Sequence, residues 1–268
     1  MTTEPAQFTT RVLSMLIFPD FERFFAQVHG CACTLYFFGR HLSPVPGTAT
    51  QRAERLGSVP DRSQQHFPHR ELMRAREAAA VRELVRNGQA HGILVYADGE
   101  PVGWCHFGRV DELPVPSKES SQDKIYARHA DTDWVINCFT TRMDFRRQGV
   151  AGRALKAAVA AIKKRGGGWI EAVPMVFPHD DPMVRKLRRT FRWRSPEVAD
   201  YLRDNWPSRE LPDIGRVSAC LNSTKTMGHM GSMSMFEKAG FKATQRDEHR
   251  SSDDPHHPGD FVVMRLRV

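Results

Sequence analysis

The sequence has few cysteines and no apolar run long enough to cross a membrane. Its five cysteines are odd in number and scattered among 268 residues, which fits reduced thiols better than a disulfide framework. A membrane-spanning helix needs about 20 consecutive apolar residues. The run Val12–Phe18 is shorter, and no small-residue cleavage site follows it. These absences predict a cytoplasmic protein without a membrane anchor.

The chain also lacks the spacings that most often mark metal sites and serine nucleophiles. No C-x-x-C occurs, and His29, Cys31 and Cys33 have no second pair of ligands nearby, so we expect no metal and interpret these cysteines as small buried residues. No nucleophile-elbow motif for a Ser/His/Asp triad is present. The formal net charge of +8 favours anionic ligands or surfaces, but it would suit many stable proteins equally well.

The order of predicted elements indicates an α/β fold with a mixed sheet. Two apolar runs around Asp98-Gly99 are typical of a β-hairpin. A strand over 133–141, a helix over 149–165 and a strand over 168–175 form a βαβ unit, whose crossover requires a parallel strand pair. Helices are further predicted over 69–87, 195–206 and in "GSMSMFEKAGF", and the chain closes on a strand over 261–268.

Composition divides the chain into an N-terminal extension, residues 1–68, packed on a main domain, residues 69–268. A basic, proline-punctuated insertion occupies about 177–227 of this domain. Its stretch "RKLRRTFRWR" interleaves basic and aromatic residues, which can bind nucleic acid. We favour a solvated helix face with Leu187, Phe191 and Trp193 packed inward.

The most informative motif is "DFRRQGVAGRAL", residues 144–155, which lies between a predicted strand and a predicted helix. Arg146, Gly149 and Ala151 satisfy the pattern Arg/Gln-x-x-Gly-x-Gly/Ala at the start of the helix. Such a turn presents successive backbone N–H groups at a positive helix end, and small residues allow close approach of a phosphate. The turn therefore predicts a pyrophosphate site.

The segments Glu71–Met175 and Gly231–Val268 together resemble the GNAT family of acyl-CoA-dependent N-acyltransferases. The helix, the "ADGEPVGW" hairpin, the "VINCFTTRMDFRRQGVAGRAL" strand and turn, the "WIEAVP" strand and the "SMFEKAGF" helix occur in the family's order. The N-terminal "HGCACTLYFF" is similar to a cysteine-containing segment of a bacterial subgroup. A GNAT-like, partly splayed mixed sheet flanked by helices is the fold implied.

The resemblance implies acetyl-CoA as co-substrate, with its pantetheine arm in the gap beside the strand that precedes the turn. By the motif, pantetheine pairs near Phe139, Thr140 and Thr141. The pyrophosphate is then held by the turn and the first helical residues, which are Arg146, Arg147, Gln148, Gly149, Val150, Ala151 and Gly152. A neutral amine, entering from the opposite side of the sheet, attacks the thioester directly, and the N–H of Phe139 or Thr140 polarises its carbonyl.

Two features of the expected chemistry stay open. The amine needs a general base, for which Asp133 and Glu171 are candidates, although each could equally be an exposed or salt-bridged carboxylate. Many family members carry a tyrosine as proton donor where this chain has Phe236. We expect Phe236 to pack beside the coenzyme tail, and its presence keeps a non-catalytic acyl-CoA-binding or regulatory protein as an alternative.

The expected acceptor is the primary amine of a small molecule, and the expected protein is a monomer or homodimer. Acylation of a protein lysine or a charged tRNA is a further alternative, prompted by the basic insertion. Nucleic acid is otherwise not an expected partner.

Overall fold

The computed structural model describes residues 6–28, 37, 78–113, 129–174, 181–192, 195–205, 208–211, 215–218, 229–244, 251–252, 259–260 and 262–268. His29, Cys31 and Cys33 lie outside the described residues, as does the predicted boundary at residue 68. That boundary therefore stays a prediction. Within the predicted helix over 69–87, residues 78–86 are described and are helical.

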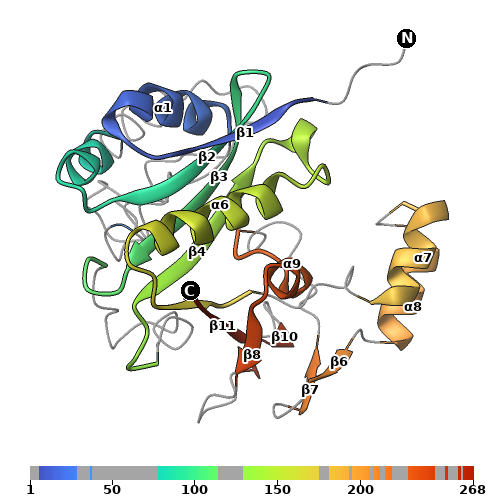
Figure 1. The fold of residues 1–268 in the computed structure, drawn as a ribbon. Helices are drawn as coiled ribbons and strands as arrows, with labels where there is room; N and C mark the ends of the chain where they lie inside the picture. Colours follow the sequence, from blue (N-terminus) through green and yellow to red (C-terminus); the bar gives the residue numbers. More distant parts are fainter. Residues whose placement is uncertain are drawn as a thin grey trace, which may run out of the picture.

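Seven strands form one mixed sheet in the order β1-β2-β3-β4-β5-β11-β8 (Figure 1). They span Phe8–Val12 (β1), His91–Ala97 (β2), Glu100–Arg109 (β3), Trp134–Thr141 (β4), Trp169–Ala172 (β5), Lys242–Thr244 (β8) and Val263–Arg267 (β11). Every neighbouring pair is antiparallel except β4 and β5, which are parallel and joined through helix α6, Val150–Lys164. The predicted α/β class, mixed sheet and βαβ unit are confirmed.

The hairpin of β2 and β3 turns at Asp98-Gly99, as the sequence predicts. Both residues have positive φ, 49° and 85° respectively. Two central residues with positive φ define the type I′ turn, whose twist matches that of the flanking strands. The hairpin therefore follows from local sequence alone.

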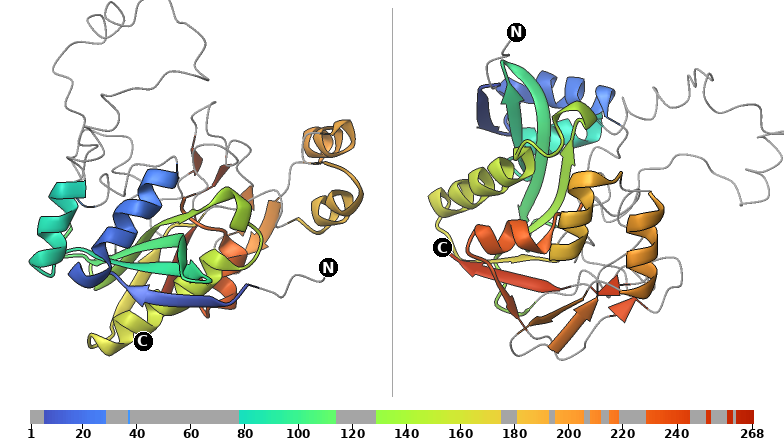
Figure 2. Two further views of the ribbon diagram at one scale, coloured as in Figure 1. Left: turned by 90° about the horizontal axis from the view of Figure 1, so that it is seen from above. Right: turned by 90° about the vertical axis from the view of Figure 1, so that its right-hand side faces the viewer.

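Helices cover both faces of the sheet (Figures 1 and 2). Helix α6 crosses one face above β1 to β4 and buries Ala154, Leu155, Ala158 and Ile162 in the larger core. Helix α1, Phe18–Gln27, covers the other face and packs its phenylalanines on Trp104. The two faces of the central strands are therefore both buried.

Gly103 on β3 allows the start of α6 to lie close to the sheet. A Cβ atom at this position would come within 2.2 Å of Val150 Cγ1. Val150 is the first residue of α6 and is buried. The absence of a side chain at Gly103 thus allows the amino end of α6 to pack closely against β3 and β4.

The β4 strand carries a β-bulge that the sequence pattern did not predict. Its register against β3 skips Asn137, since Phe107 faces Ile136 and His106 faces Cys138. One extra residue reverses the alternation of side chains. Ile136 and Phe139 consequently both join the core under α6, whereas Cys138 joins the core on the opposite face.

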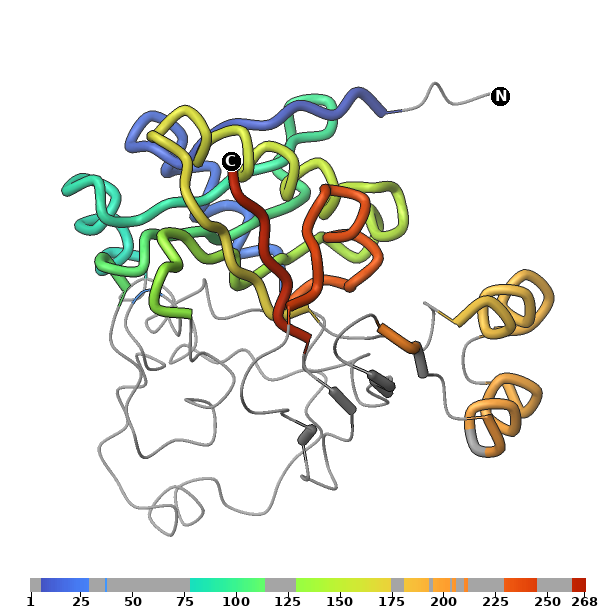
Figure 3. Tube along the Cα trace, turned by 60° about the horizontal axis from the view of Figure 1, so that its bottom comes forward, coloured from blue at the N-terminus to red at the C-terminus, as the bar shows by residue number. Residues whose placement is uncertain are grey.

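The strands β4 and β5 diverge after a short paired stretch. Their parallel register runs only from Trp134 opposite Ile170 to Ile136 opposite Ala172, so β5 is shorter than the strand predicted over 168–175. Figure 3 shows the dark red β11 running beside the yellow β5 on its other side. The remaining length of β4, up to Thr141, therefore has β3 on one edge and a gap on the other.

The predicted basic insertion contains two helices, α7 (Pro182–Thr190) and α8 (Pro196–Asp204), and the antiparallel pair β6 (Ser208–Leu211) and β7 (Gly215–Ser218). Val184, Val198 and Leu202 form a small core between the helices, with Leu187 and Phe191 packed against it. The inward positions predicted for Leu187 and Phe191 are confirmed, and Trp193 lies outside the described residues.

The chain is completed by α9 (Met233–Lys238), the 3-10 turns η1 (Met15–Ile17) and η2 (Met143–Phe145), and the two-residue strands β9 (Ser251–Ser252) and β10 (Gly259–Asp260). The Ser232 hydroxyl caps α9 by accepting the Met235 N–H. Among the residues described, none of the helices is long and apolar enough to span a bilayer.

Candidate functional site

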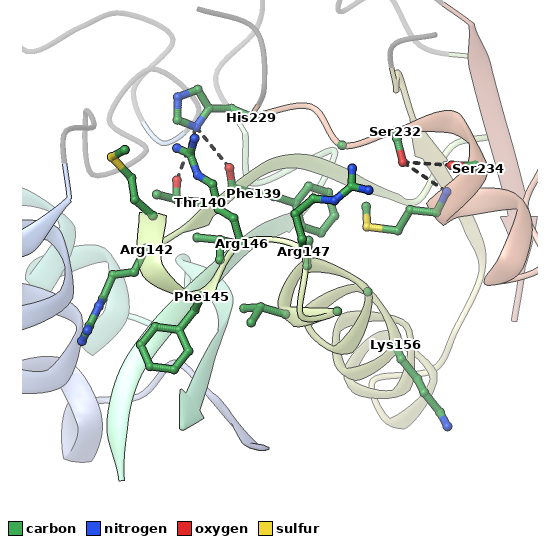
Figure 4. A pocket seen from close by; sticks show the side chains of 18 of the residues that line it. Phe139, Thr140, Arg142, Phe145, Arg146, Arg147, Lys156, His229, Ser232 and Ser234 are labelled. Carbon is green, nitrogen blue, oxygen red and sulfur yellow. Dashed lines mark hydrogen bonds between the residues drawn. The ribbon is translucent and has the colours of Figure 1, made fainter. Parts of the chain in front are cut away.

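A cavity of about 1780 Å³ lies where the free length of β4, the start of α6 and α9 meet. Figure 4 shows this opening, with the side chains of Arg146 and Arg147 reaching into it. The main chain of β4 and of the turn that follows it forms one wall, and α9 with the residues before it forms another. The residues that line it include Gln27, Val28, Phe139, Thr140, Thr141, Arg142, Asp144, Arg146, Arg147, Gly149, Val150, Ala151, Gly152, Lys156, Arg188, His229, Ser232 and Lys238.

The turn into α6 leaves backbone N–H groups without helical acceptors. Gly149 is the N-cap residue at φ 81°, and the helical ladder begins only where Arg153 N donates to the Gly149 carbonyl at 3.0 Å. Within the described part of the chain no side chain caps this end, and its first turn contains no acidic residue. The N–H groups of Val150, Ala151 and Gly152 therefore present an uncompensated positive helix end to the cavity.

Two glycines keep this helix end open. A Cβ atom added to Gly149 or Gly152 would meet no atom within 4 Å. Gly149 needs glycine for its left-handed φ, but Gly152 lies inside α6, where glycine costs about 0.5 to 1 kcal/mol relative to alanine. The packing of the described residues gives no reason for glycine at 152, so its missing side chain is best explained by a ligand that approaches the helix.

Positive charge surrounds the same end of the cavity. Six cationic side chains line it, which are Arg142, Arg146, Arg147, Lys156, Arg188 and Lys238. The acidic side chain of Asp144 is paired with Arg142, and this hydrogen bond lowers the pKa of Asp144. The cavity therefore suits a ligand with several negative charges.

His229 occupies the edge of β4 that faces the gap. Its carbonyl oxygen accepts the Phe139 N–H at 2.5 Å, and its Nδ1 lies 3.1 Å from the Phe139 carbonyl oxygen. The Thr140 hydroxyl is 3.4 Å from the same ring nitrogen. One residue thus satisfies both main-chain groups of Phe139 on the side where β5 has diverged.

Most of the residues predicted to hold the coenzyme line this cavity. Gln148 and Phe236 do not belong to the lining. The Gln148 amide donates to the Asp144 carbonyl at 2.9 Å. Phe236 is fully buried, with its ring 5.9 Å from that of Phe139 and 5.0 Å from that of Phe241. Phe236 is therefore a core residue next to a cavity wall.

The candidate base Asp133 lies just before the opposite end of β4. Its Oδ2 accepts the Trp169 N–H at 2.8 Å, and its own N–H donates to the Trp169 carbonyl at 3.0 Å. These two bonds fasten the first residues of β4 and β5 together. Asp133 is not part of the cavity lining.

The candidate base Glu171 is buried on β5, with 2% of its surface exposed. Its Oε2 accepts the His129 backbone N–H at 3.1 Å and the Thr132 hydroxyl at 2.9 Å, and it lies 2.8 Å from His129 Nδ1. Arg265 Nε lies 4.0 Å away. Buried carboxylates are stable when they are hydrogen-bonded and paired in this way. Glu171, too, lies outside the cavity lining.

Several lining residues were not predicted as site residues. Lys156 follows Gly152 by four residues, so helical spacing could have placed it on the same face. His229, Lys238 and Arg188 come from elements far along the chain, and no local pattern links them to the turn. Ser232 lines the cavity, and its hydroxyl accepts the Met235 N–H within its own helix cap.

Comparisons with solved structures return acetyltransferases at low similarity. A histone acetyltransferase HPA2 and related acetyltransferase from Corynebacterium glutamicum is 12% identical, with 96% of this chain and 94% of that chain covered and a TM-score of 0.42. An N-acetyltransferase from Staphylococcus aureus Mu50 is 8% identical, with 97% and 98% covered and a TM-score of 0.40. The GNAT domain of S. lividans PAT is 12% identical, with 98% and 97% covered and a TM-score of 0.38.

No curated protein matches the sequence. The sequence profile of the Acetyltransferase (GNAT) family, in contrast, matches residues 58–207. This span covers more than half of the chain and includes β2 to β5 and the turn into α6. The chain therefore belongs to the GNAT acetyltransferase family and is an acyltransferase by family.

Proposed function

We propose that the protein transfers the acetyl group of acetyl-CoA to a primary amine of a small molecule by direct attack of the amine on the thioester. The observation that carries the proposal is the start of α6, where uncapped N–H groups and the open surface of Gly152 face a cation-lined cavity. This combination suits a pyrophosphate.

The cavity offers coenzyme A positive charge as well as open backbone N–H groups. Coenzyme A carries a pyrophosphate and a further phosphate, which require several cations and hydrogen-bond donors. Arg146 and Arg147 flank the helix end, while Lys156, Arg188 and Lys238 extend the positive lining beyond it. Bound acetyl-CoA would supply an activated acyl group, and the protein would orient it along the free edge of β4.

The edge of β4 has two residues that direct main-chain groups into the gap. Phe139 does so, and by strand alternation Thr141 does as well, while Arg142 N donates across to Val102 on β3 at 3.0 Å. Because the Phe139 N–H donates to His229, the acyl carbonyl can be polarised there only if the His229 peptide shifts. Pairing of pantetheine with Thr141 requires no such shift.

The acceptor is proposed to enter from the face of the sheet opposite α6. Gln27 and Val28 from the end of α1 line the cavity on that side. The basic, exposed face of α7 favours a second candidate acceptor, a protein or a charged tRNA, since it presents Arg185, Lys186, Arg188 and Arg189 to solvent.

Two further expectations stay predictions. One is membership of the bacterial subgroup with a cysteine-containing N-terminal segment, and the other is a monomeric or homodimeric state.

The proposed function is tested by measuring thiol release from acetyl-CoA with a panel of amines. Spermidine, ethanolamine, phenethylamine, lysine and an aminoglycoside cover linear, aromatic, zwitterionic and polycationic acceptors. We expect at least one amine to raise thiol release above the rate with acetyl-CoA alone, and mass spectrometry to find the N-acetylated product.

Titration with coenzyme A by calorimetry separates the alternatives. Tight coenzyme binding without amine-dependent thiol release would contradict the proposed enzyme and favour a binding or regulatory protein. Salt-sensitive binding of tRNA, with no small amine accepted, would instead favour the macromolecular acceptor.

A further inference from the structure

His229 is placed where the proposed acyl transfer needs a proton acceptor. It lines the cavity and contacts β4 at Phe139 and Thr140, at the mouth of the gap left by β5. The Thr140 side chain lies on the face of the sheet opposite α6, because the bulge at Asn137 moves Phe139 to the α6 face. The His229 ring therefore lies on the side from which the acceptor is proposed to enter.

No other described lining residue suits this role. The remaining titratable side chains in the lining are arginines, lysines and Asp144. Arginine and lysine are protonated at neutral pH. Asp144 has a pKa lowered by its hydrogen bond to Arg142, so it is a weak base, and Asp133 and Glu171 lie outside the lining.

The contacts of His229 fix which ring nitrogen is available. The Phe139 carbonyl oxygen can only accept, so Nδ1, 3.1 Å away, donates to it. In the neutral ring the lone pair then resides on Nε2. Figure 4 shows this second nitrogen on the side of the ring turned away from β4.

We infer that His229 is the general base that accepts the proton of the acceptor's ammonium group through Nε2, directly or through one water. This inference deepens the proposed function and rests on it. His229 would then act in place of Asp133 and Glu171.

Nε2 takes one proton from the ammonium group, and the neutral amine nitrogen forms a bond to the thioester carbonyl carbon. The carbon–sulfur bond breaks, and the coenzyme thiolate takes up the second proton of the attacking nitrogen. The products are the amide and free coenzyme A, and His229 returns its proton to solvent.

Among the described residues, two charged or titratable groups act on the ring, Cys138 from β4 and Arg146 from the turn before α6. The pKa of His229 is raised, chiefly by a hydrogen bond with the Cys138 side chain and also by the bond to the Phe139 backbone, while burial and Arg146 lower it. A base works only when it is deprotonated, so kcat should fall on the acid side at a pH above 6.5, the ordinary pKa of histidine.

The first test compares two nucleophiles in a His229→Asn variant. The asparagine amide nitrogen can take the place of Nδ1 and keep the bond to the Phe139 carbonyl, but it cannot accept a proton. With the best alkylamine of the panel, kcat should fall by about 100-fold or more. With hydroxylamine, which is already neutral at assay pH, the rate should stay within about threefold because no base is needed.

The second test changes the neighbour of the base. A Cys138→Ala variant removes the group that raises the pKa of His229, so the acid limb of kcat should move to lower pH. NMR titration of the His229 ring should show the same downward shift of its pKa, without any turnover. Asp133→Asn and Glu171→Gln variants should leave the position of the acid limb unchanged.

The outcomes separate this inference from the proposed function. If the wild type shows no amine-dependent thiol release, the proposed function fails and the base assignment falls with it. If the wild type turns over and His229→Asn keeps its alkylamine rate, or loses both nucleophiles equally while binding coenzyme normally, only the base assignment is wrong.

Discussion

The two ends of β4 are built differently, although they belong to one strand of eight residues. At its start, β4 is paired on both edges, and Asp133 fastens it to Trp169 of β5 through two hydrogen bonds. At its end, only β3 pairs with it, and the other edge faces a cavity lined by cations. At the first end, the carboxylate of Asp133 bonds the neighbouring strand. At the second end, His229 bonds the main-chain groups of Phe139 that β5 leaves unpaired.

This contrast explains why residue type alone misplaces the chemistry. Outside the motif itself, Asp133 and Glu171 are the nearest carboxylates on either side of it in sequence. Asp133 bonds Trp169 of β5, and Glu171 on β5 bonds His129 and Thr132, which precede β4. His229 reaches Phe139 from ninety positions further along the chain. The open end of the strand is where a ligand has room, and the paired end is where the sheet is held closed.

The largest effect is expected from a side chain that fills the space beside the start of α6, at the open end of β4. In Gly152→Leu, the new side chain starts in free space on a helix with ordinary helical φ, so folding should be retained. The side chain would cover the N–H groups of the first turn. Coenzyme A affinity, measured by calorimetry, should fall by about 100-fold or more, which is about 2.7 kcal/mol.

Gly152→Ala is the matched control for this change. One methyl group leaves most of the cavity free, and alanine stabilises a helix interior by about 0.5 to 1 kcal/mol relative to glycine. We expect a slightly higher melting temperature and a much smaller loss of affinity. Unchanged affinity in Gly152→Leu would mean that the pyrophosphate lies elsewhere.

Replacing Phe236 tests whether this position belongs only to the core or also takes part in the chemistry of the open end. In Phe236→Tyr, the new hydroxyl enters a fully buried position between Phe139 and Phe241. A buried hydroxyl without a partner costs about 1 to 3 kcal/mol. We therefore expect a loss of this size in the free energy of unfolding, measured with urea, and no gain in kcat.

Phe236→Leu serves as the control, since it removes ring contacts without adding a polar atom. A rise in kcat together with unchanged stability in Phe236→Tyr would contradict the core assignment. It would show that the position can still donate a proton to the leaving thiolate.

The sequence predicts best the features that depend on residues close together in the chain. The Asp98-Gly99 turn and the turn into α6 depend on residues that are adjacent in the chain, so their glycines and spacing identify them. The bulge at Asn137 and the early end of β5 depend on which strands lie alongside, and the alternation of apolar residues does not encode that. A period-2 pattern continued past Ile136 would place Cys138, and not Phe139, in the core under α6.

The same reasoning applies to the site. The part of the cavity that is proposed to hold the coenzyme could be located from the sequence because helix start, glycines and arginines fall within a dozen residues. The part proposed to receive the acceptor could not, because Gln27 and Val28 come from the end of α1 and His229 from a segment much further along the chain. Phe236 could be recognised as a departure from the family, but only its burial shows that it is part of the core.

We expect the positive charge of Lys156, at the open end of β4, to strengthen coenzyme A binding only by direct contact. Lys156 lines the cavity one turn beyond Gly152, and its side chain is exposed. In Lys156→Ala, coenzyme A affinity at low salt should fall by about two- to fivefold, the effect of an exposed ion pair. Lys164→Ala at the far end of α6 removes the same charge outside the cavity. Equal losses in both variants would indicate a long-range field instead of a contact.

The smallest effect on coenzyme binding and catalysis is expected at the paired end of β4. In Asp133→Asn, the amide oxygen can still accept the Trp169 N–H, although it carries no charge. Because the side chain is exposed, the loss in the free energy of unfolding should be about 0.5 to 1.5 kcal/mol. Coenzyme affinity and the pH dependence of kcat should not change. A displaced acid limb would reverse the comparison, since a carboxylate at the paired end would then act in proton transfer.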